Sequence, residues 1–337
     1  MYTFYFYRNK IVFAISKNAK LGLFKTNSHN IIEVDSCCII DENINKLICH
    51  INNVLVDFKK QIYDWQSHKG IIKNLSIRYV GGEYLFIITQ TSAYELFAKE
   101  LAQKLNDLQI KFSLYICINN KNNSVVYGKL IYISGTKDIC ICENNIKTKL
   151  KPLSFMQVNN FVKEKIYNDI SNSVIGKNII DAYAGRGVLS AILSKKANKI
   201  VAIEIEKQSY QDAEQLKKSN KISNLTIKNG DCGVILPQLL KENNFDAIIL
   251  DPPRSGCTKG IVECLIKYLP QEIIYQSCNS ATLARDIKSL VKSNKYDIEC
   301  IRFYDMFPQT SEIETLCVFR RKNGKQKRYF HFLQKRR

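Results

Sequence analysis

Three reactive or flexible features in the second half of the chain each come at the end of an apolar stretch that is typical of a buried strand. Cys278 ends one such stretch, Asp251 follows another, and the glycine pair Gly185 and Gly187 follows a third. The carboxyl ends of parallel strands meet at one edge of a sheet, so these features are expected to lie close together. Glycines let a backbone approach a cofactor, and a thiol can bond covalently to a substrate. The combination predicts a group-transfer reaction.

Cys278 is the candidate nucleophile among 12 cysteines, most of which lie in apolar segments as small hydrophobic residues do. Asn279 and a helix-like stretch follow it, and a helix N-terminus would favour the thiolate. A thiolate can add to C6 of uracil and make C5 nucleophilic, after which a base must remove the C5 proton. Glu312 and Glu314 alternate on the last predicted strand, so only one of them can face the site. Their spacing does not choose between them.

The segment around Gly185 and Gly187 predicts a cofactor loop that is not of the dinucleotide type, because Ser190 stands where a third glycine would fall. Glu204 ends the next predicted strand, where a carboxylate can accept hydrogen bonds from both hydroxyls of a ribose. Asp231 ends the third strand and could accept from an adenine amino group. An ordinary turn aspartate is the alternative for Asp231.

Asp251 begins the segment Asp-Pro-Pro-Arg, in which two prolines stiffen the loop and fix the direction of the carboxylate. Methyltransferases that act on exocyclic amino groups have a similar loop, but with an aromatic residue in the place of Arg254. An arginine is better suited to a phosphate or a carbonyl oxygen. The alternative is a rigid strand-to-helix turn with a helix-capping role.

The elements that must position these residues alternate between strands and helices after residue 159. This alternation predicts a doubly wound parallel sheet, closed by a hairpin whose two strands are joined by residues 307–311. Seven strands that end in a hairpin are typical of the adenosylmethionine-dependent methyltransferase fold. The first half contains short strands, among them 31–40, and a helical spacing over 92–108, which indicates an α+β domain. The predicted domains are 1–150, 151–321 and a basic tail, 322–337.

The composition is that of a globular protein, with 45% hydrophobic and 24% charged residues in a chain of 337. A net charge of +19 and a pI near 9.3 favour a polyanionic partner, although a coding bias toward Lys, Asn and Ile would also raise the charge. Without a long apolar run or a signal peptide, the protein is expected in the cytoplasm. The cysteine spacings match no standard metal site, so no metal is expected.

Five segments, in this order along the chain, resemble the motifs of the RNA uracil-5-methyltransferase family. They are 154–159 (SFMQVN), 181–187 (DAYAGRG), 251–256 (DPPRSG), 277–286 (SCNSATLARD) and 305–314 (DMFPQTSEIE). The resemblance runs from about Tyr7 to Arg321. It implies that Cys278 is the nucleophile and that Glu314, rather than Glu312, is the base.

The same resemblance implies S-adenosyl-L-methionine as the cofactor and RNA as the substrate. The implied cofactor contacts are Gln157, Tyr183, Gly185, Gly187, Glu204, Asp231 and Asp251, with Val188 at a position where an Asn is common in relatives. Segments 7–10, 22–29, 34–39 and 118–128 resemble the ribosomal RNA branch more than the transfer RNA branch. We therefore expect a uridine of 23S rRNA as the target, with a uridine of the tRNA T-loop as the alternative.

Two other functions are less well supported by the residues. RNA cytosine-5-methyltransferases have a cysteine after the proline of the fourth motif, whereas Arg254 follows Pro253 in this chain. An RNA-binding factor without chemistry would not need Cys278, Glu314 and Glu204. A monomeric enzyme without a membrane association is expected.

The chain departs from the family pattern in three ways. The small β-barrel (TRAM or OB) module that precedes this region in many relatives is missing, and so is the cysteine cluster that binds iron-sulfur in some of them. Glu312 replaces the usual histidine, and a second carboxylate near Glu314 could raise its pKa. The tail 322–337, with basic and aromatic residues, is expected either to help the first domain bind RNA in place of the barrel or to be a solvated extension.

Overall fold

The computed structural model describes residues 4–322, which form two compact units. The first unit comprises residues 4–141 and 149–160, and the second comprises 142–148 and 161–322. The predicted boundary near residue 150 therefore lies in a region where the chain passes more than once between the units. The predicted basic tail, apart from Lys322, lies outside the described residues.

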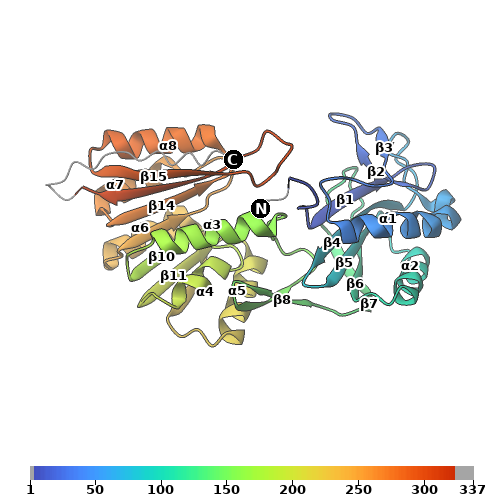
Figure 1. The fold of residues 1–337 in the computed structure, drawn as a ribbon, viewed down its shortest axis with the longest axis horizontal. Coiled ribbons are helices and arrows are strands. Elements are labelled where there is room, and N and C mark those ends of the chain that lie inside the picture. The colour runs from blue at the N-terminus through green and yellow to red at the C-terminus, as the bar shows by residue number, and fades with distance from the viewer. Residues whose placement is uncertain (1–3, 323–337) are drawn as a thin grey trace. The chain divides into compact units, whose positions relative to one another are not determined.

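The first unit is built on a seven-stranded sheet with the order β3-β2-β1-β4-β5-β6-β7 (Figure 1). Its neighbouring strands are antiparallel except for β5 and β6, which are parallel and are connected by helix α2. Its elements are β1 (Lys10–Ile15), β2 (Leu21–Phe24), β3 (Ile31–Glu33), α1 (Glu42–Leu55), η1 (Val56–Gln61), β4 (Ile72–Val80), β5 (Glu83–Gln90), α2 (Leu96–Asp107), β6 (Phe112–Ile118) and β7 (Lys129–Gly135).

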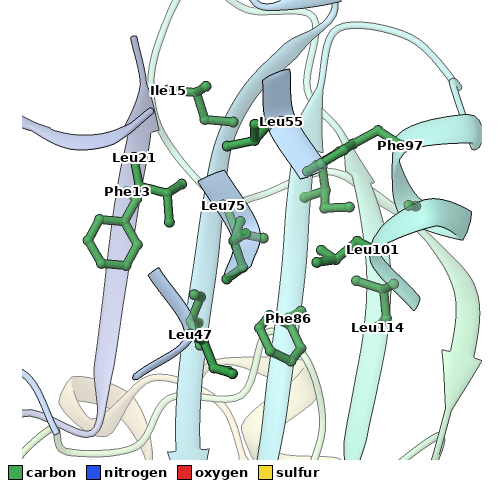
Figure 2. Close-up of a cluster of buried hydrophobic side chains, with 14 of the residues drawn as sticks. Phe13, Ile15, Leu21, Leu47, Leu55, Leu75, Phe86, Phe97, Leu101 and Leu114 are labelled. Atoms are coloured by element: carbon green, nitrogen blue, oxygen red, sulfur yellow. The ribbon is translucent and has the colours of Figure 1, made fainter. Parts of the chain in front are cut away.

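The core of the first unit lies between one face of this sheet and the two helices α1 and α2 (Figure 2). Phe13, Leu75 and Phe86 on the strands meet Leu47 of α1 and Leu101 of α2. All five side chains are buried, as expected where an amphipathic helix covers a sheet. A second, smaller cluster of buried residues, which includes Leu85 and Cys117, forms apart from this layer.

The strand predicted over residues 31–40 is only partly present, because β3 ends at Glu33. The backbone beyond it turns, and the Asn45 side chain takes the place of a strand partner. Its Oδ1 accepts from Cys37 N (2.9 Å), and its Nδ2 donates to the carbonyl oxygens of Cys37 (2.9 Å) and Ile40 (3.1 Å). A side chain that satisfies backbone groups in this way removes the need for a longer strand.

A short hairpin of β8 (Ile139–Glu143) and β9 (Ile146–Leu150) follows, and the sequence analysis did not predict it. Asn144 and Asn145 form its turn, both with positive φ (49° and 64°), as two-residue hairpin turns require. Buried and exposed residues alternate along both strands. Residues 142–148, which form the tip, belong to the second unit.

The second unit contains a seven-stranded sheet with the order β12-β11-β10-β13-β14-β16-β15 (Figure 1). The first five of these strands are parallel, and β16 is antiparallel to both β14 and β15. The predicted fold class, a doubly wound sheet closed by a hairpin, is confirmed. Its elements are α3 (Asn160–Ser173), β10 (Asn178–Ala182), α4 (Val188–Ser194), β11 (Lys199–Glu204), α5 (Lys207–Ser219), β12 (Leu225–Asn229), α6 (Cys232–Glu242), β13 (Ala247–Leu250), α7 (Lys259–Tyr268), β14 (Glu272–Ser277), α8 (Ser280–Lys292), β15 (Tyr296–Tyr304) and β16 (Glu314–Arg321).

Helices cover both faces of this sheet, which explains why its central strands are largely apolar. Leu236 of α6 and Leu265 of α7 belong to the core on one face, and Ile166 of α3 and Leu193 of α4 belong to the core on the other. The four residues of β13 are all buried. A strand enclosed in this way can present polar chemistry only at its end. Among residues 4–322, no helix is long and apolar enough to cross a membrane.

Candidate active site

The candidate residues of the second unit follow the carboxyl ends of five parallel strands. The loop with Gly185 follows β10, Glu204 ends β11, Asp231 follows β12, Asp251 follows β13 and Cys278 follows β14. Because these strands run in one direction, all five positions lie along the same edge of the sheet. The order of the strands changes direction between β10 and β13, and ligands of open α/β sheets bind at such a point.

The cofactor loop between β10 and α4 is held in an unusual backbone conformation. Tyr183, Gly185 and Gly187 have φ values of 64°, 55° and 73°. A side chain on Gly187 would bring its Cβ within 3.0 Å of the Cβ of Ala213, so α4 and α5 pack closely only because this residue is a glycine. A non-glycine residue with positive φ, such as Tyr183, is typical of functional loops.

Glu204 is buried, and its carboxylate is oriented by two backbone donors. Gly185 N donates to Oε2 (2.8 Å), and Glu206 N donates to Oε1 (2.7 Å). Each carboxylate oxygen can accept further hydrogen bonds, so the group remains able to bind the hydroxyls of a ribose. The same contact fixes the cofactor loop to the end of β11.

Asp231 caps helix α6, since its Oδ1 accepts a hydrogen bond from Gly233 N (2.7 Å). Neither interpretation of the sequence predicted this capping role, although it is a local role like that of the turn aspartate. Asp231 is exposed, and only Oδ1 is needed for the cap, so capping does not preclude binding of an amino group.

A buried ion cluster that the sequence analysis did not anticipate lies behind the cofactor loop. Arg186 donates to Glu143 Oε1 (2.7 Å), and Lys163 Nζ donates to Glu143 Oε2 (2.5 Å). The three side chains are 4 to 5% exposed. Burial alone would raise the pKa of Glu143, but the two cations outweigh burial and hold this pKa below its ordinary value. The Asn-Asn turn between two alternating stretches was the signal for the hairpin that carries Glu143.

Asp181 lies at the end of β10 and is buried. Burial and the neighbouring Glu204 raise its pKa, a hydrogen bond donated by Ser190 opposes this, and the pKa is about 6. Ser190, which stands where a dinucleotide loop would have glycine, therefore ties α4 to β10. The loop is closed by this side-chain contact rather than by a third glycine.

Cys278 is half-buried and lines an open pocket of about 240 Å³. The other lining residues are Arg254, Asn279, Ser280, Ser311, Glu312 and Ile313. Burial, Glu314 and Asp251 raise the pKa of the Cys278 thiol above its ordinary value, and Arg254 opposes them. The helix N-terminus that follows Cys278 does not bring this pKa below its ordinary value, because burial has the largest effect and the two carboxylates add to it.

Glu314 is 3% exposed, and its Oε2 has no hydrogen-bond partner within the described part of the chain. Burial has the largest effect and raises the pKa of Glu314, and the carboxylate of Glu312 also raises it. A hydrogen bond from Gln276 and the charge of Arg254 lower it. The pKa is raised to about 6. A buried carboxylate with an unpaired oxygen is unfavourable for folding and is typical of a group that accepts a proton.

Glu312 precedes β16 and forms an ion pair with Arg254 across the pocket, with 3.2 Å between Oε1 and the guanidinium. Its side chain is 40% exposed, whereas Glu314 is buried. The two glutamates thus have different surroundings, as their alternation requires.

Asp251 is exposed as a residue, although many protein atoms lie around its carboxylate. This crowding and the carboxylates of Glu314 and Asp181 raise its pKa well above the ordinary value. Two other carboxylates thus lie close enough to Asp251, at the end of β13, to raise its pKa. A cationic or proton-bearing ligand would relieve their repulsion.

The loop after Asp251 is fastened to helix α8 by hydrogen bonds with two side chains, the buried Asp286 and the exposed Arg285. Asp286 Oδ2 accepts from Cys257 N (2.9 Å) and from the hydroxyl of Tyr275 (2.8 Å), and Arg285 donates to the carbonyl oxygens of Ser255 (3.0 Å) and Cys257 (3.1 Å). The backbone from Arg254 to Cys257 is therefore held by the helix that Cys278 precedes.

Gln157 is the one predicted cofactor contact that belongs to the first unit. Its backbone oxygen accepts a hydrogen bond from Asn9 Nδ2 (3.1 Å), and its side chain is half-buried. The other predicted contacts all belong to the second unit.

The second unit fits an adenosylmethionine cofactor by the chemistry of its donors and by the shape of its loop. The positive φ values at Gly185 and Gly187 leave the backbone open to a ligand, and Glu204 offers an oriented carboxylate at the neighbouring strand end. Within residues 4–322, no group of three or more His, Cys, Asp and Glu side chains could hold a metal ion.

Comparison with known proteins gives matches over nearly the whole chain. The model of the tRNA (uracil-5-)-methyltransferase family matches residues 236–322, the segment with Asp251, Cys278 and Glu314. An uncharacterised RNA methyltransferase of Fusobacterium nucleatum is 35% identical, with 94% of this chain and 71% of that protein covered. One from Prochlorococcus marinus is 33% identical, with 94% of this chain and 78% of that protein covered.

Among solved structures, the tRNA (uracil-54, C5)-methyltransferase of Pyrococcus abyssi, in complex with S-adenosyl-L-homocysteine, has a TM-score of 0.81. The match covers 94% of this chain and 76% of that chain at 23% identity, so it shows a shared fold. The predictions of an enzyme and of S-adenosyl-L-methionine as its methyl donor are confirmed by the family. On these relationships, the chain belongs to the RNA uracil-5-methyltransferase family and is an adenosylmethionine-dependent RNA methyltransferase.

Proposed function

We propose that this enzyme methylates C5 of a uridine in 23S rRNA, with Cys278 as the nucleophile and Glu314 as the base. One observation supports this assignment above the others. Cys278 and the buried Glu314 come from different segments of the chain, yet they are close enough for Glu314 to raise the pKa of the thiol. A thiol and a carboxylate with an unpaired oxygen are the two groups that methylation of C5 requires.

The reaction begins with a bond between Cys278 Sγ and C6 of the uracil ring. The electrons of the C5–C6 double bond move toward the C4 carbonyl oxygen, and C5 becomes nucleophilic. Because the pKa of the thiol is raised, its proton leaves as the sulfur–carbon bond forms. Asp251, whose own pKa is raised by its surroundings, is the acceptor that we propose for this proton. The cofactor supplies the methyl group that C5 takes up.

The second half of the reaction restores the aromatic ring. Glu314 takes the proton from C5, the C5–C6 double bond forms again, and the sulfur of Cys278 leaves C6 with its electron pair. A pKa of about 6 makes Glu314 largely ionised at neutral pH and still basic enough for this step. The products are 5-methyluridine in the RNA, S-adenosylhomocysteine and one proton.

The cofactor site that we propose contains the predicted residues in distinct roles. Glu204 accepts from the ribose hydroxyls, Asp231 contacts the adenine, and the Tyr183–Gly187 loop approaches the cofactor with its backbone. Asp251 and Gln157 complete the set. Glu204 and the loop are supported by their hydrogen-bonded geometry, and Gln157 by the family resemblance alone.

The choice of 23S rRNA rests on the first half of the chain. Segments 7–10, 22–29, 34–39 and 118–128 resemble the ribosomal RNA branch, and the net charge of +19 suits a large polyanion. A uridine of the tRNA T-loop is the second candidate, because the matching family model and the Pyrococcus relative are both described by tRNA substrates. Either RNA would place the enzyme in the cytoplasm.

The test is to incubate the enzyme with labelled adenosylmethionine and total RNA from a strain that lacks it, and to identify the labelled base by mass spectrometry. We expect 5-methyluridine in one fragment of 23S rRNA, and no label with Cys278→Ala. Label in tRNA would favour the second candidate. Label on a base other than uracil, or an active Cys278→Ala variant, would refute the proposed chemistry.

A further inference from the structure

The pocket beside Cys278 contains an ion pair for which the chemistry above has no use. Arg254 and Glu312 face each other at 3.2 Å, and both line the pocket of about 240 Å³ that Cys278 lines. Arg254 is 69% exposed and Glu312 is 40% exposed. Exposed ion pairs contribute little to stability, so folding alone gives no reason for this one.

The backbone on both sides of the pair is held in place. The carbonyl oxygen of Arg254 accepts hydrogen bonds from Asn279 Nδ2 (3.2 Å) and from Thr282 Oγ1 (3.2 Å). Glu312 N donates to Thr310 Oγ1 (3.2 Å), whose hydroxyl donates to the carbonyl oxygen of Phe307 (2.7 Å). The guanidinium and the carboxylate are therefore presented to the pocket by fixed loops, as preorganised binding groups are.

The polar atoms of the pair match one edge of uracil. Uracil presents a carbonyl oxygen at C4 and an N–H group at N3, which are an acceptor beside a donor. Arginine has only donors, and an ionised glutamate has only acceptors. Cytosine presents the reverse order, an amino group at C4 and an unprotonated N3. A carboxylate facing N3 of cytosine would bring two acceptors together and make no hydrogen bond.

The burial and exposure of the side chains agree with this match. C6 must lie at the sulfur of Cys278, and C5 must lie near the buried Glu314. N3 is directly across the ring from C6. The group that accepts a hydrogen bond from N3–H must therefore lie nearer the solvent than Glu314 does. Glu312 is that group in this pocket, since it is the more exposed of the two glutamates.

We propose that Glu312 accepts a hydrogen bond from N3–H of the target uracil and that Arg254 holds Glu312 in place while donating to the neighbouring carbonyl oxygen. Glu312 is then a specificity residue that distinguishes uracil from cytosine. This inference rests on the proposed uridine chemistry. It gives a role to the glutamate that replaces the usual histidine.

The experiment uses two transcripts of the methylated RNA fragment, with U or C at the target position, and measures the affinity of the full-length enzyme for each. We expect Glu312→Gln to bind the U transcript about 10-fold more weakly, because a hydrogen bond to a charged group is lost. Since an amide can also donate, the preference for U over C should fall at least 10-fold. Glu263→Gln, which removes the exposed partner of Lys259 in the same unit, is the matched control.

A third transcript carries N3-methyluridine at the target, which has no N3–H. Wild-type enzyme should bind it about 10-fold more weakly than the U transcript, and Glu312→Ala, which lacks the acceptor and leaves room for the methyl group, should bind the two alike. The proposal is overturned if Glu312→Gln keeps the wild-type preference for U over C, or if Glu312→Ala still discriminates against N3-methyluridine. Failure of wild-type enzyme to methylate the U transcript would instead refute the proposed function.

Discussion

Glu314 combines two properties that oppose each other in folding and in catalysis. Its burial and the unpaired Oε2 disfavour the ionised carboxylate, whereas proton removal from C5 requires that form. The pKa of about 6 in the folded protein lies above the ordinary value of 4.5. Protonation of Glu314 therefore favours the folded state, and the free energy of unfolding falls as the pH rises from about 4.5 through about 6.

Glu314→Gln should remove this pH-dependent cost. At pH 8 we expect the variant to be more stable than wild type by about 2 kcal/mol, and the difference should vanish near pH 4, where Glu314 is protonated in both states. Denaturant unfolding at the two pH values measures the difference. Glu263→Gln, on the surface of the same unit, should show no such pH dependence. The stability of Glu314→Gln relative to wild type should thus be greater at pH 8 than at pH 4. The opposite order would contradict the assigned burial of the charge.

The sequence could identify Cys278 and the two glutamates but not their surroundings. Alternation along a strand predicts that Glu312 and Glu314 differ in direction, yet it does not say which one is buried. The structure decides this because β16 begins at Glu314, whereas Glu312 lies in the preceding loop beside Arg254. The raised pKa of Cys278 could not be predicted from the sequence either, since it depends on burial and on carboxylates from two other segments.

At the level of elements, the β8–β9 hairpin supplies a buried anion to the cofactor loop. Glu143, at the end of β8, bonds both to Arg186 of the loop and to Lys163 of α3. This contact holds the loop from one side, while Glu204 holds it from the other through Gly185. The loop is thus positioned for the cofactor by groups that need not touch it.

Glu143→Gln should therefore affect both stability and cofactor binding. We expect the free energy of unfolding to fall by about 3 kcal/mol, because two buried cations lose their common partner. The KM for adenosylmethionine should rise by a larger factor than the KM for RNA. It should also rise by a larger factor than that by which kcat falls. A purely structural role would not produce these differences. Steady-state kinetics and denaturant unfolding provide the measurements. Equal changes in both KM values would contradict a role in positioning the loop.

Of the elements, those enclosed on both faces were the most predictable. The parallel strands of the second sheet have apolar, buried centres and alternate with helices, so their type and order followed from the sequence. The β8–β9 hairpin was missed because its strands have only five residues each, of which two are exposed. Strand 31–40 was overestimated because a side chain, Asn45, replaces the backbone partners that a strand would need.

For the whole molecule, the order of strands explains why a distant pair of residues can share one reaction. Placing β16 beside β14 brings the start of β16 next to the end of β14, where Ser277 is paired with Thr315. Cys278 follows Ser277 and Glu314 precedes Thr315 in the sequence. The closing hairpin therefore places the proposed base beside the proposed nucleophile. No motif states this directly, because it depends on the antiparallel insertion of the last strand.

The measurement that decides between this mechanism and its alternatives is the isolation of the protein–RNA adduct. Glu314→Gln can add Cys278 to C6 and take up the methyl group at C5, but it cannot remove the C5 proton, so the sulfur cannot leave. After incubation with adenosylmethionine and the target transcript, we predict a covalent complex of Glu314→Gln that survives denaturation, with one added methyl group by intact mass and the link at Cys278 by peptide mapping. Cys278→Ala should form none. Normal turnover by Glu314→Gln, or an adduct at another residue, would contradict the mechanism.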